Sequence, residues 1–491
     1  MTFDLGPIDI TVLLAYLALT VAIGLKVSGK TKDLESYLLG DRNLPWWAIL
    51  GSIVATETST ATVLSVPGEG YGPTGMKFLQ LALGYIVGRT IIVQTLLPLY
   101  FRGKLFTAYE VLDKRFGGAT KRAASLLFLV TRNLGDGLRL YLAAIVLQKL
   151  AGLPFELSVI VMGAVTIVYT FFGGMRSVVW NDCVQLVIYM VGGIAAVFVI
   201  AAHIDGGWGE LFRFAAENQK FEMFDFSFSL AKKYTFWAGL IGGAVLTIGT
   251  HGTDQMMVQR YLSARSQTDA GRAIIASGFF VFFQFCVFLF IGIELACYYS
   301  QFPPSVAPKA DEVFANFIVH VFPPNTGLAG LMLAAILAAA MSTLSSSLNS
   351  SASALVNDFY VSSKKKPSSP EHLFNVTRLL TIAFGILQIM IAIWARGLDA
   401  TVVTNALTIA GFSAGMLLGV FALGTLTRRA GQVAALVGAA AGLSVLLYLQ
   451  FVAPKQGIVV AFPWFALIGA MTTFLTGYLV SLVIPKRELA T

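Results

Sequence analysis

The chain has 491 residues, 56% of them apolar and only 12% charged, and its formal net charge at pH 7 is +8. An ordinary soluble domain carries roughly a quarter charged residues, so this composition excludes a water-soluble protein and indicates a chain embedded in a lipid bilayer. A helix needs about 20 mostly apolar residues to cross the hydrocarbon core, and such stretches recur along the whole sequence. We predict an all-α polytopic membrane protein.

About thirteen apolar segments are predicted to be transmembrane helices, with the termini on opposite sides because the number is odd. In chain order they are residues 8–25, 46–65, 77–100, 123–150, 157–172, 178–202, 236–258, 273–299, 328–356, 379–395, 402–426, 433–452 and 458–484.

Basic residues set the expected orientation, because Lys and Arg in short loops resist translocation. Most of the 34 Lys and Arg residues fall in alternate loops, which predicts the cell inner (plasma) membrane with the N-terminus outside and the C-terminus cytoplasmic. The net charge is thus a signal of topology, and we expect no nucleic-acid partner. The expected cytoplasmic basic residues lie within 26–42, 102–122, 260–272, 364–378, 428–429 and 486–487, and at Arg176.

The second segment is interrupted by a run of hydroxyl residues around Glu57, from Thr56 to Thr62. Such a patch is typical of a discontinuous helix, in which unwound carbonyls coordinate a cation and the half-helix ends face a solute. The alternative is an intact helix whose hydroxyls bond back to carbonyls one turn earlier. A carboxylate at this depth argues against that alternative.

The ninth segment carries a serine-rich face. Ser342, Ser345 and Ser346 share one side of a helix, and Ala339 lies one turn away. Hydroxyl and carbonyl oxygens gathered in this way suit a hard cation, and sodium is the natural candidate because few carboxylates accompany them. The alternative is a small-residue face for close helix packing.

An acidic residue stands one turn inside the sixth segment. Asp182 needs a partner at membrane depth, and a bound cation beside the serine face would supply one. The alternative is an interfacial carboxylate that is wetted from the cytoplasm.

The fourth segment carries three charges on one face, Arg132, Asp136 and Arg139. We expect Asp136 to pair with one of the two arginines, and either Glu57 or an anionic group of a solute to balance the other. Arg89 and Asp254 lie near the ends of segments, where snorkelling or wetting is expected.

Four stretches together resemble one family: Gly173-Gly174-Met175-Arg176-Ser177 with Trp180 and Asp182, Val258-Gln259-Arg260-Tyr261, the serine block 338–349, and Arg429-Ala430 followed by Gly438. The chain, over about residues 9–483, resembles the sodium:solute symporters, which are similar in fold to LeuT-type transporters with a five-plus-five inverted repeat. This resemblance implies an extra N-terminal transmembrane helix and cytoplasmic loop (1–45), a ten-helix core (46–427) and two C-terminal transmembrane helices (428–491).

The resemblance also implies two sodium sites. The main site would comprise Ala55, Thr58, Ala339, Ser342 and Thr343. A second site, found in bacterial members that include sialic acid symporters, would comprise Asp182, Ser342, Ser345 and Ser346.

The function implied is sodium-coupled symport, importing a small polar organic solute such as a sugar, sugar acid or organic acid by alternating access. An arginine of the sialic acid symporters is replaced here by Gly135, so sialic acid itself is not inferred. A proton-coupled or uncoupled carrier, or a channel or sensor on the same fold, are the alternatives. We expect no enzymatic activity, no cofactor besides sodium as coupling ion, lipid as the surrounding partner, and a functional monomer. The expected solute contacts are Glu57, Ser59, Thr62, Gln80, Arg132, Arg139 and Thr247.

Overall fold

The structure is a computed structural model that describes residues 5–28, 33–103, 105–304, 308–310, 312–363, 369–398 and 400–484. Some of the basic residues behind the expected orientation lie outside the described residues, namely Lys30, Lys32, Lys104, Lys364, Lys365, Lys366, Lys486 and Arg487.

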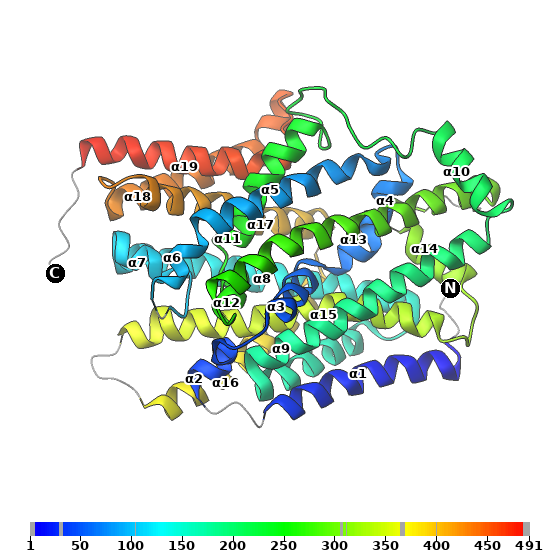
Figure 1. Ribbon diagram of the computed structural model, residues 1–491, viewed down its shortest axis with the longest axis horizontal. Coiled ribbons are helices and arrows are strands. Elements are labelled where there is room, and N and C mark those ends of the chain that lie inside the picture. Colours follow the sequence, from blue (N-terminus) through cyan, green and yellow to red (C-terminus); the bar gives the residue numbers. More distant parts are fainter. Residues whose placement is uncertain are drawn as a thin grey trace.

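The described residues form helices joined by loops, with one isolated bridge between Leu44 and Ala264, so the all-α prediction is confirmed. Most helices run along the long axis of the molecule (Figure 1). The helices are α1 (Pro7–Ser28), α2 (Leu34–Leu39), α3 (Trp46–Glu57), α4 (Thr60–Tyr71), α5 (Leu79–Thr95), α6 (Leu97–Phe101), α7 (Glu110–Phe116), α8 (Gly118–Ala151), α9 (Phe155–Ala202), α10 (Gly207–Glu217), α11 (Gly243–Gly252), α12 (Gln255–Leu262), α13 (Gln267–Gln301), α14 (Val313–Val321), α15 (Leu328–Ala354), α16 (Pro370–Ala395), α17 (Ala400–Leu426), α18 (Gln432–Phe451) and α19 (Pro463–Val483).

Within the described ranges, nine helices are long and apolar enough to cross a membrane, and α3 with α4 forms a tenth, broken span. Two predicted segments are united in α9, which kinks at Gly174, where φ is +53° and a Cβ would meet the Tyr37 carbonyl oxygen at 2.4 Å. Neither α8 nor α11 is among these nine helices, because α8 carries many charges and α11 has only 10 residues. The number thirteen and the division at 45/46 and 427/428 therefore stay predictions.

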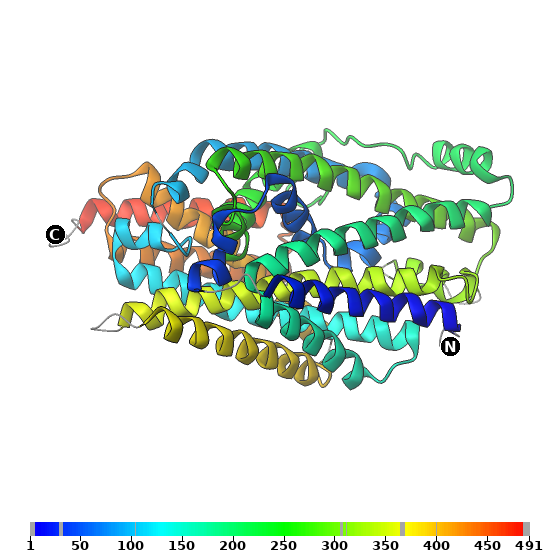
Figure 2. The same cartoon turned by 60° about the horizontal axis from the view of Figure 1, so that its bottom comes forward.

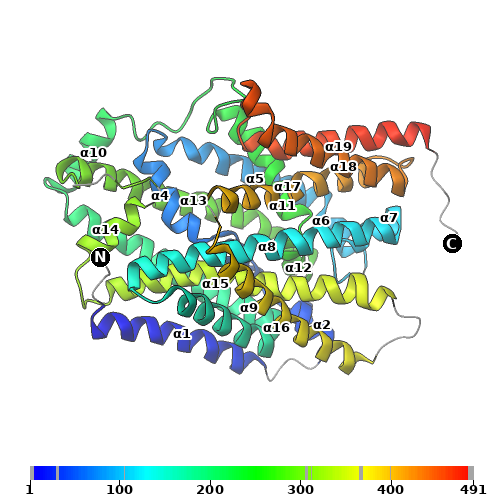
Figure 3. The ribbon, with the colours of Figure 1, turned by 180° about the vertical axis from the view of Figure 1, so that it is seen from behind.

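The centre of the bundle is α15, whose apolar stretch is 89% buried, more than in any other of the nine spans. It packs against α1, α3, α8, α9 and α16. Figure 1 shows α3 and α13 on the near side of the molecule, and Figure 3 shows α8 and α16 on the opposite side. The Ala and Ser side chains of α15 permit this enclosure, because small residues let neighbouring helices approach closely.

The first helix is fastened to the start of α15. The buried Asp9 carboxylate accepts hydrogen bonds from the backbone N–H groups of Asn325 (2.8 Å) and Gly327 (2.9 Å). Gly327 is the N-cap of α15, and the Gly330 N–H of its first turn lies 3.3 Å from the same carboxylate, so Asp9 complements a helix N-terminus, which lacks intrahelical acceptors and favours negative charge. Figure 2 shows α1 lying alongside α15, so this contact fixes the long central helix relative to α1.

Candidate functional site

The break between α3 and α4 bends the two half-helices by 66°. Thr58 and Ser59 are extended, and the chain re-enters a helix through a reciprocal cap in which the Ser59 N–H donates to the Thr62 hydroxyl at 3.3 Å. The predicted discontinuity is confirmed, and the intact-helix alternative is wrong. Because α3 stops here, the carbonyls of its last turn lack the amide partners of a continuing helix.

Hydroxyl groups of α15 meet those carbonyls. Ser342 Oγ donates to the Ala55 carbonyl at 2.8 Å and lies 3.1 Å from the Ala339 carbonyl oxygen. Thr343 Oγ1 donates to the Thr56 carbonyl at 3.2 Å and lies 3.5 Å from the same Ala339 oxygen. These oxygens are all uncharged, buried and close together, which is the donor set that suits a hard monovalent cation.

Thr58 follows directly at the end of α3. Its hydroxyl donates to the Val54 carbonyl at 2.7 Å, lies 3.0 Å from Gln284 Oε1 and accepts from Tyr189 at 3.1 Å, so it links α3 to α9 and α13. We call the set proposed for the main sodium site the neutral cluster: Ala55, Thr58, Ala339, Ser342 and Thr343.

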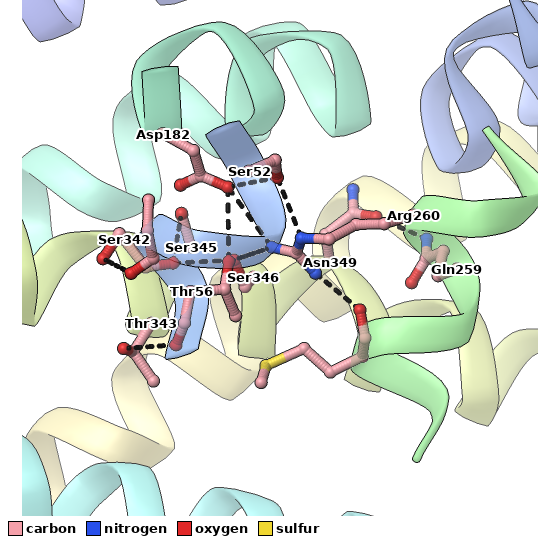
Figure 4. Close-up of polar contacts among 12 residues, drawn as sticks. Ser52, Thr56, Asp182, Gln259, Arg260, Ser342, Thr343, Ser345, Ser346 and Asn349 are labelled. Atoms are coloured by element: carbon pink, nitrogen blue, oxygen red, sulfur yellow. Dashed lines mark hydrogen bonds and ion pairs between the residues drawn. The ribbon is translucent and has the colours of Figure 1, made fainter. Parts of the chain in front are cut away.

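A second polar group surrounds Asp182, which is fully buried on α9. Its Oδ2 atom accepts from Ser52 Oγ at 2.5 Å and from Thr56 Oγ1 at 3.3 Å. The Arg260 guanidinium of α12 lies 3.3 Å from the same oxygen and also donates to the Ser346 hydroxyl. Figure 4 shows the guanidinium reaching between Ser52 and Ser346 towards Asp182. We call these five residues the charged cluster.

The sequence predicts a second sodium site at Asp182, Ser342, Ser345 and Ser346. It does not predict the arginine that lies beside Asp182. The Ser345 and Ser346 hydroxyls donate to the Ser342 carbonyl at 3.1 and 2.7 Å, on the side of α15 that faces Asp182. Arg260 was expected in a cytoplasmic loop, but its side chain is only 1% exposed. Its place in the 258–261 motif was the available signal, yet the motif says nothing about which carboxylate it meets. Asp182 is therefore buried and paired, and the wetted-interface alternative is wrong.

A cavity of about 260 Å³ opens next to the break, small beside typical ligand pockets of about 300–1,000 Å³. Five of the seven expected solute contacts line it: Glu57, Ser59, Arg132, Arg139 and Thr247. Its wall is completed by Thr56, Tyr85, Leu246, Thr250, His251, Met256, Met257 and Thr343.

The other two expected solute contacts, Thr62 and Gln80, form hydrogen bonds within the protein. The Thr62 hydroxyl caps α4 at Ser59. Gln80 donates to the Tyr234 carbonyl at 3.2 Å and accepts from the Asp225 N–H at 2.9 Å, so it ties the 225–234 loop to α5. The structure places neither residue on the cavity wall among the residues that it describes. Polar groups inside a membrane protein also serve caps and loops, which spacing alone does not distinguish from ligand contacts.

The charges around the cavity form pairs that differ from the expected ones. Glu57 pairs with Arg89, whose side chain is fully buried instead of snorkelling to the surface, and not with Arg132 or Arg139. The glutamate also lies 3.4 Å from His251 Nε2.

Arg132 and Arg139 share the buried Asp136 carboxylate, at 3.7 and 2.5 Å. Arg132 also pairs with Asp254 at 2.7 Å, so the second acid comes from the start of α12 and not from the broken helix. The expectation that Asp136 pairs with an arginine of its own helix agrees with these distances. Three carboxylates thus face three guanidinium groups around the cavity, and none of the three acids is left without a cation.

The chain is similar to known sodium-coupled transporters. The solved structure of a substrate-bound, outward-open sodium-coupled sialic acid symporter matches with a TM-score of 0.89 at 29% identity, over 99% of this chain and 100% of that one. The sodium/sialic acid symporter SiaT of Proteus mirabilis is 29% identical over 498 residues, covering 99% of this chain and 97% of that protein. The human sodium/iodide cotransporter is 28% identical over 450 residues, covering 90% of this chain and 70% of that protein.

The fold and these similarities define a sodium-coupled secondary transporter of the LeuT type, a multi-pass membrane protein and not an enzyme. The family model for "Sodium:solute symporter family" matches residues 37–442, and the chain belongs to that family. Its activity is sodium-coupled symport of a small organic solute, with sodium as the coupling ion.

Proposed function

We propose that sodium bound at the neutral cluster drives import of a small polar solute that binds in the cavity beside the α3/α4 break. The observation that carries this proposal is that the two sites share the break and one side chain. The Thr343 hydroxyl bonds to the end of α3 within the neutral cluster, and Thr343 also lines the cavity. A change in the position of either half-helix therefore alters both sites together.

This shared boundary is the physical basis for coupling. An ion and a solute that each stabilise the same arrangement of α3, α4 and α15 raise each other's affinity, by linkage. Sodium moving inward down a membrane potential releases about 2.3 kcal/mol per charge for each 100 mV, which the carrier uses to accumulate solute by alternating access.

The paired charges of the cavity favour a solute without net charge, such as a sugar. Each arginine on the wall already faces a carboxylate, so a solute carboxylate would have to compete with Asp136 or Asp254. The small volume further favours a compact molecule.

A sugar acid or another organic acid is the second candidate, and one observation favours it. The Arg139 side chain is 43% exposed although its partner Asp136 is fully buried, which leaves part of its guanidinium open to an anionic group. Relatives named for sialic acid and for iodide carry anions.

The orientation and surroundings belong to the same proposal. We place the protein as a monomer in the lipid of the inner (plasma) membrane, with its N-terminus outside and its C-terminus cytoplasmic. Two observations support this placement: α1 begins and α19 ends at opposite ends of the bundle (Figure 1), and basic residues are concentrated in alternate loops. The thirteen-span division would then put 46–427 at the transporting core.

A thermal-shift screen of the detergent-purified protein tests the proposal, because a ligand that binds the folded state raises the apparent melting temperature. Hexoses, sialic acid, monocarboxylates, amino acids and vitamins are screened in sodium and in choline buffer, and hits are carried into uptake by proteoliposomes with an imposed sodium gradient. We expect a hexose-like solute to stabilise the protein only in sodium and to accumulate. Uptake without sodium, or only at acidic external pH, would establish the uncoupled or proton-coupled alternative.

A further inference from the structure

Arg260 occupies the place that a second cation would need. Its guanidinium donates to Ser52 Oγ at 2.8 Å and to Thr56 Oγ1 at 2.5 Å, besides its contacts to Asp182 and Ser346. The whole side chain is buried, so it is held by these polar groups and not by water. The protein thus supplies its own positive charge to the one carboxylate of the cluster.

Only one oxygen of that carboxylate is engaged. Oδ2 of Asp182 accepts from Ser52, Thr56 and Arg260, whereas Oδ1 has no hydrogen-bond partner among the residues that the structure describes. A buried, unpartnered carboxylate oxygen is costly and is an open position for a cation. The Arg260 guanidinium contacts both this carboxylate and the Ser346 hydroxyl, and Figure 4 shows Ser342, Ser345 and Ser346 on the side of α15 that faces Asp182.

Two positive charges beside one buried carboxylate repel each other strongly, because a protein interior screens charge less than water does. A sodium ion that binds Asp182 would lie within a few ångströms of the Arg260 guanidinium. One carboxylate can neutralise one of the two charges, so full occupancy by both is disfavoured.

We propose that Arg260 is a built-in competitor of sodium at Asp182. The guanidinium neutralises the carboxylate while no ion is there, and it withdraws from the carboxylate when sodium binds. This inference rests on the proposed sodium-coupled function and adds a specific exchange of cations to it.

The helix that carries Arg260 connects this exchange to the solute cavity. Arg260 also donates to the Met256 carbonyl at 2.5 Å, and Met256 and Met257 line the cavity. At the other end of α12, Asp254 accepts from the Met256 N–H at 2.9 Å and pairs with Arg132 of the cavity wall. Withdrawal of the guanidinium therefore removes contacts that hold α12 in place, and α12 carries residues that line the solute cavity.

The test is a sodium titration of the apparent melting temperature in detergent, at constant ionic strength with choline. We expect Arg260→Gln to be less stable than the wild type in choline and to have a sodium midpoint lower by about tenfold or more, within the range of typical couplings between sites. The matched control is Arg115→Gln, which removes a guanidinium that binds the Gly424 and Thr427 carbonyls away from the cluster, and its midpoint should equal that of the wild type. The double variant Asp182→Asn/Arg260→Gln should lose the gain in sodium affinity.

Chemical rescue keeps the inference falsifiable if Arg260→Gln does not fold. In Arg260→Ala, millimolar guanidinium should raise the sodium midpoint several-fold, whereas the wild type should not respond. An unchanged or higher sodium midpoint in Arg260→Gln, or no effect of guanidinium on Arg260→Ala, would overturn the inference. A wild type that sodium does not stabilise over choline would instead overturn the proposed function.

Discussion

The neutral cluster and the charged cluster both include residues of α15 and of the last turns of α3, yet they present opposite surroundings to a cation. Ser342 of the first and Ser346 of the second are four residues apart on α15. The neutral cluster presents uncharged oxygens made available by the end of α3, so its geometry depends on the break. The charged cluster holds a full negative charge together with a resident positive one.

Two neighbouring sites with such different charges should respond differently to the same ion. Under the proposed assignment, a sodium ion at the neutral cluster would add a charge and replace only hydroxyl-to-carbonyl hydrogen bonds. A sodium ion at the charged cluster would replace a guanidinium, so ion binding and rearrangement of Arg260 would be one event. The first site should report on the position of the helices, and the second on the exchange of cations.

The largest expected effect is on the stability of the charged cluster. Asp182→Asn leaves the Arg260 guanidinium buried without its carboxylate, and breaking a buried pair in this way costs about 3–5 kcal/mol. We expect a pronounced fall in the apparent melting temperature measured in choline. Asp182→Asn/Arg260→Gln should recover much of the loss, and Asp205→Asn on the surface should change nothing. A double variant that is as unstable as the single one would show that the uncompensated guanidinium is not the cause.

The neutral cluster should instead lose sodium affinity. Ser342→Ala removes the hydroxyl that bonds to both the Ala55 and Ala339 carbonyls, and losing one polar contact to a charged group corresponds to about 10- to 100-fold in affinity. The readout is the sodium midpoint of solute uptake or of thermal stabilisation.

Ser347→Ala is the matched control for Ser342→Ala. Ser347 is equally buried on the same helix, but its hydroxyl accepts from Gln388 of α16 at 2.9 Å, away from the break. We expect its sodium midpoint to stay near that of the wild type. Equal losses in the two variants would mean that packing of α15, and not ion coordination, sets sodium affinity.

The local features of these sites could be predicted from the sequence, because they depend on residues that are close along the chain. The hydroxyl run around Glu57 predicted the break, since such residues favour caps over continued helix. The spacing of Ser342, Ser345 and Ser346 predicted a shared face, and the structure turns that face towards the α3 break and Asp182.

The charge pairs could not be predicted, because they depend on how distant helices are rotated against each other. Glu57 and Arg89 are 32 residues apart, and Arg260 and Asp182 are 78 apart. A sequence shows that a buried charge needs a partner but not which one, so Arg89 and Arg260 were placed at the edges of spans. The sequence predicts a solute contact at Gln80, because a polar residue in an apolar helix can bind either a solute or a loop, and in the structure Gln80 binds the 225–234 loop.

A smaller effect should separate the solute site from both ion clusters. Thr247→Val removes a hydroxyl from the cavity wall, and one neutral hydrogen bond is worth about 0.5–1.5 kcal/mol, or roughly 2- to 10-fold in solute affinity. The sodium midpoint in the absence of solute should stay constant. Gln80→Leu should lower thermal stability by loosening the 225–234 loop but leave solute affinity unchanged. A loss of solute affinity in Gln80→Leu would return that residue to the solute site.

The smallest expected change in the sodium midpoint should be the same for both clusters, because the substitution acts on α15, which contributes residues to both. Asp9→Asn leaves one of two N–H groups without its acceptor, because the Asn325 N–H binds Oδ2 and the Gly327 N–H binds Oδ1, and it also removes the charge that complements the start of α15, which is worth about 0.3–1 kcal/mol. We expect small, parallel increases in the sodium midpoints of the wild-type and Arg260→Gln backgrounds, since α1 positions the whole of α15. An Asp9 variant that shifts the midpoint in only one of these backgrounds would mean that the two clusters move independently, even though both include residues of α15.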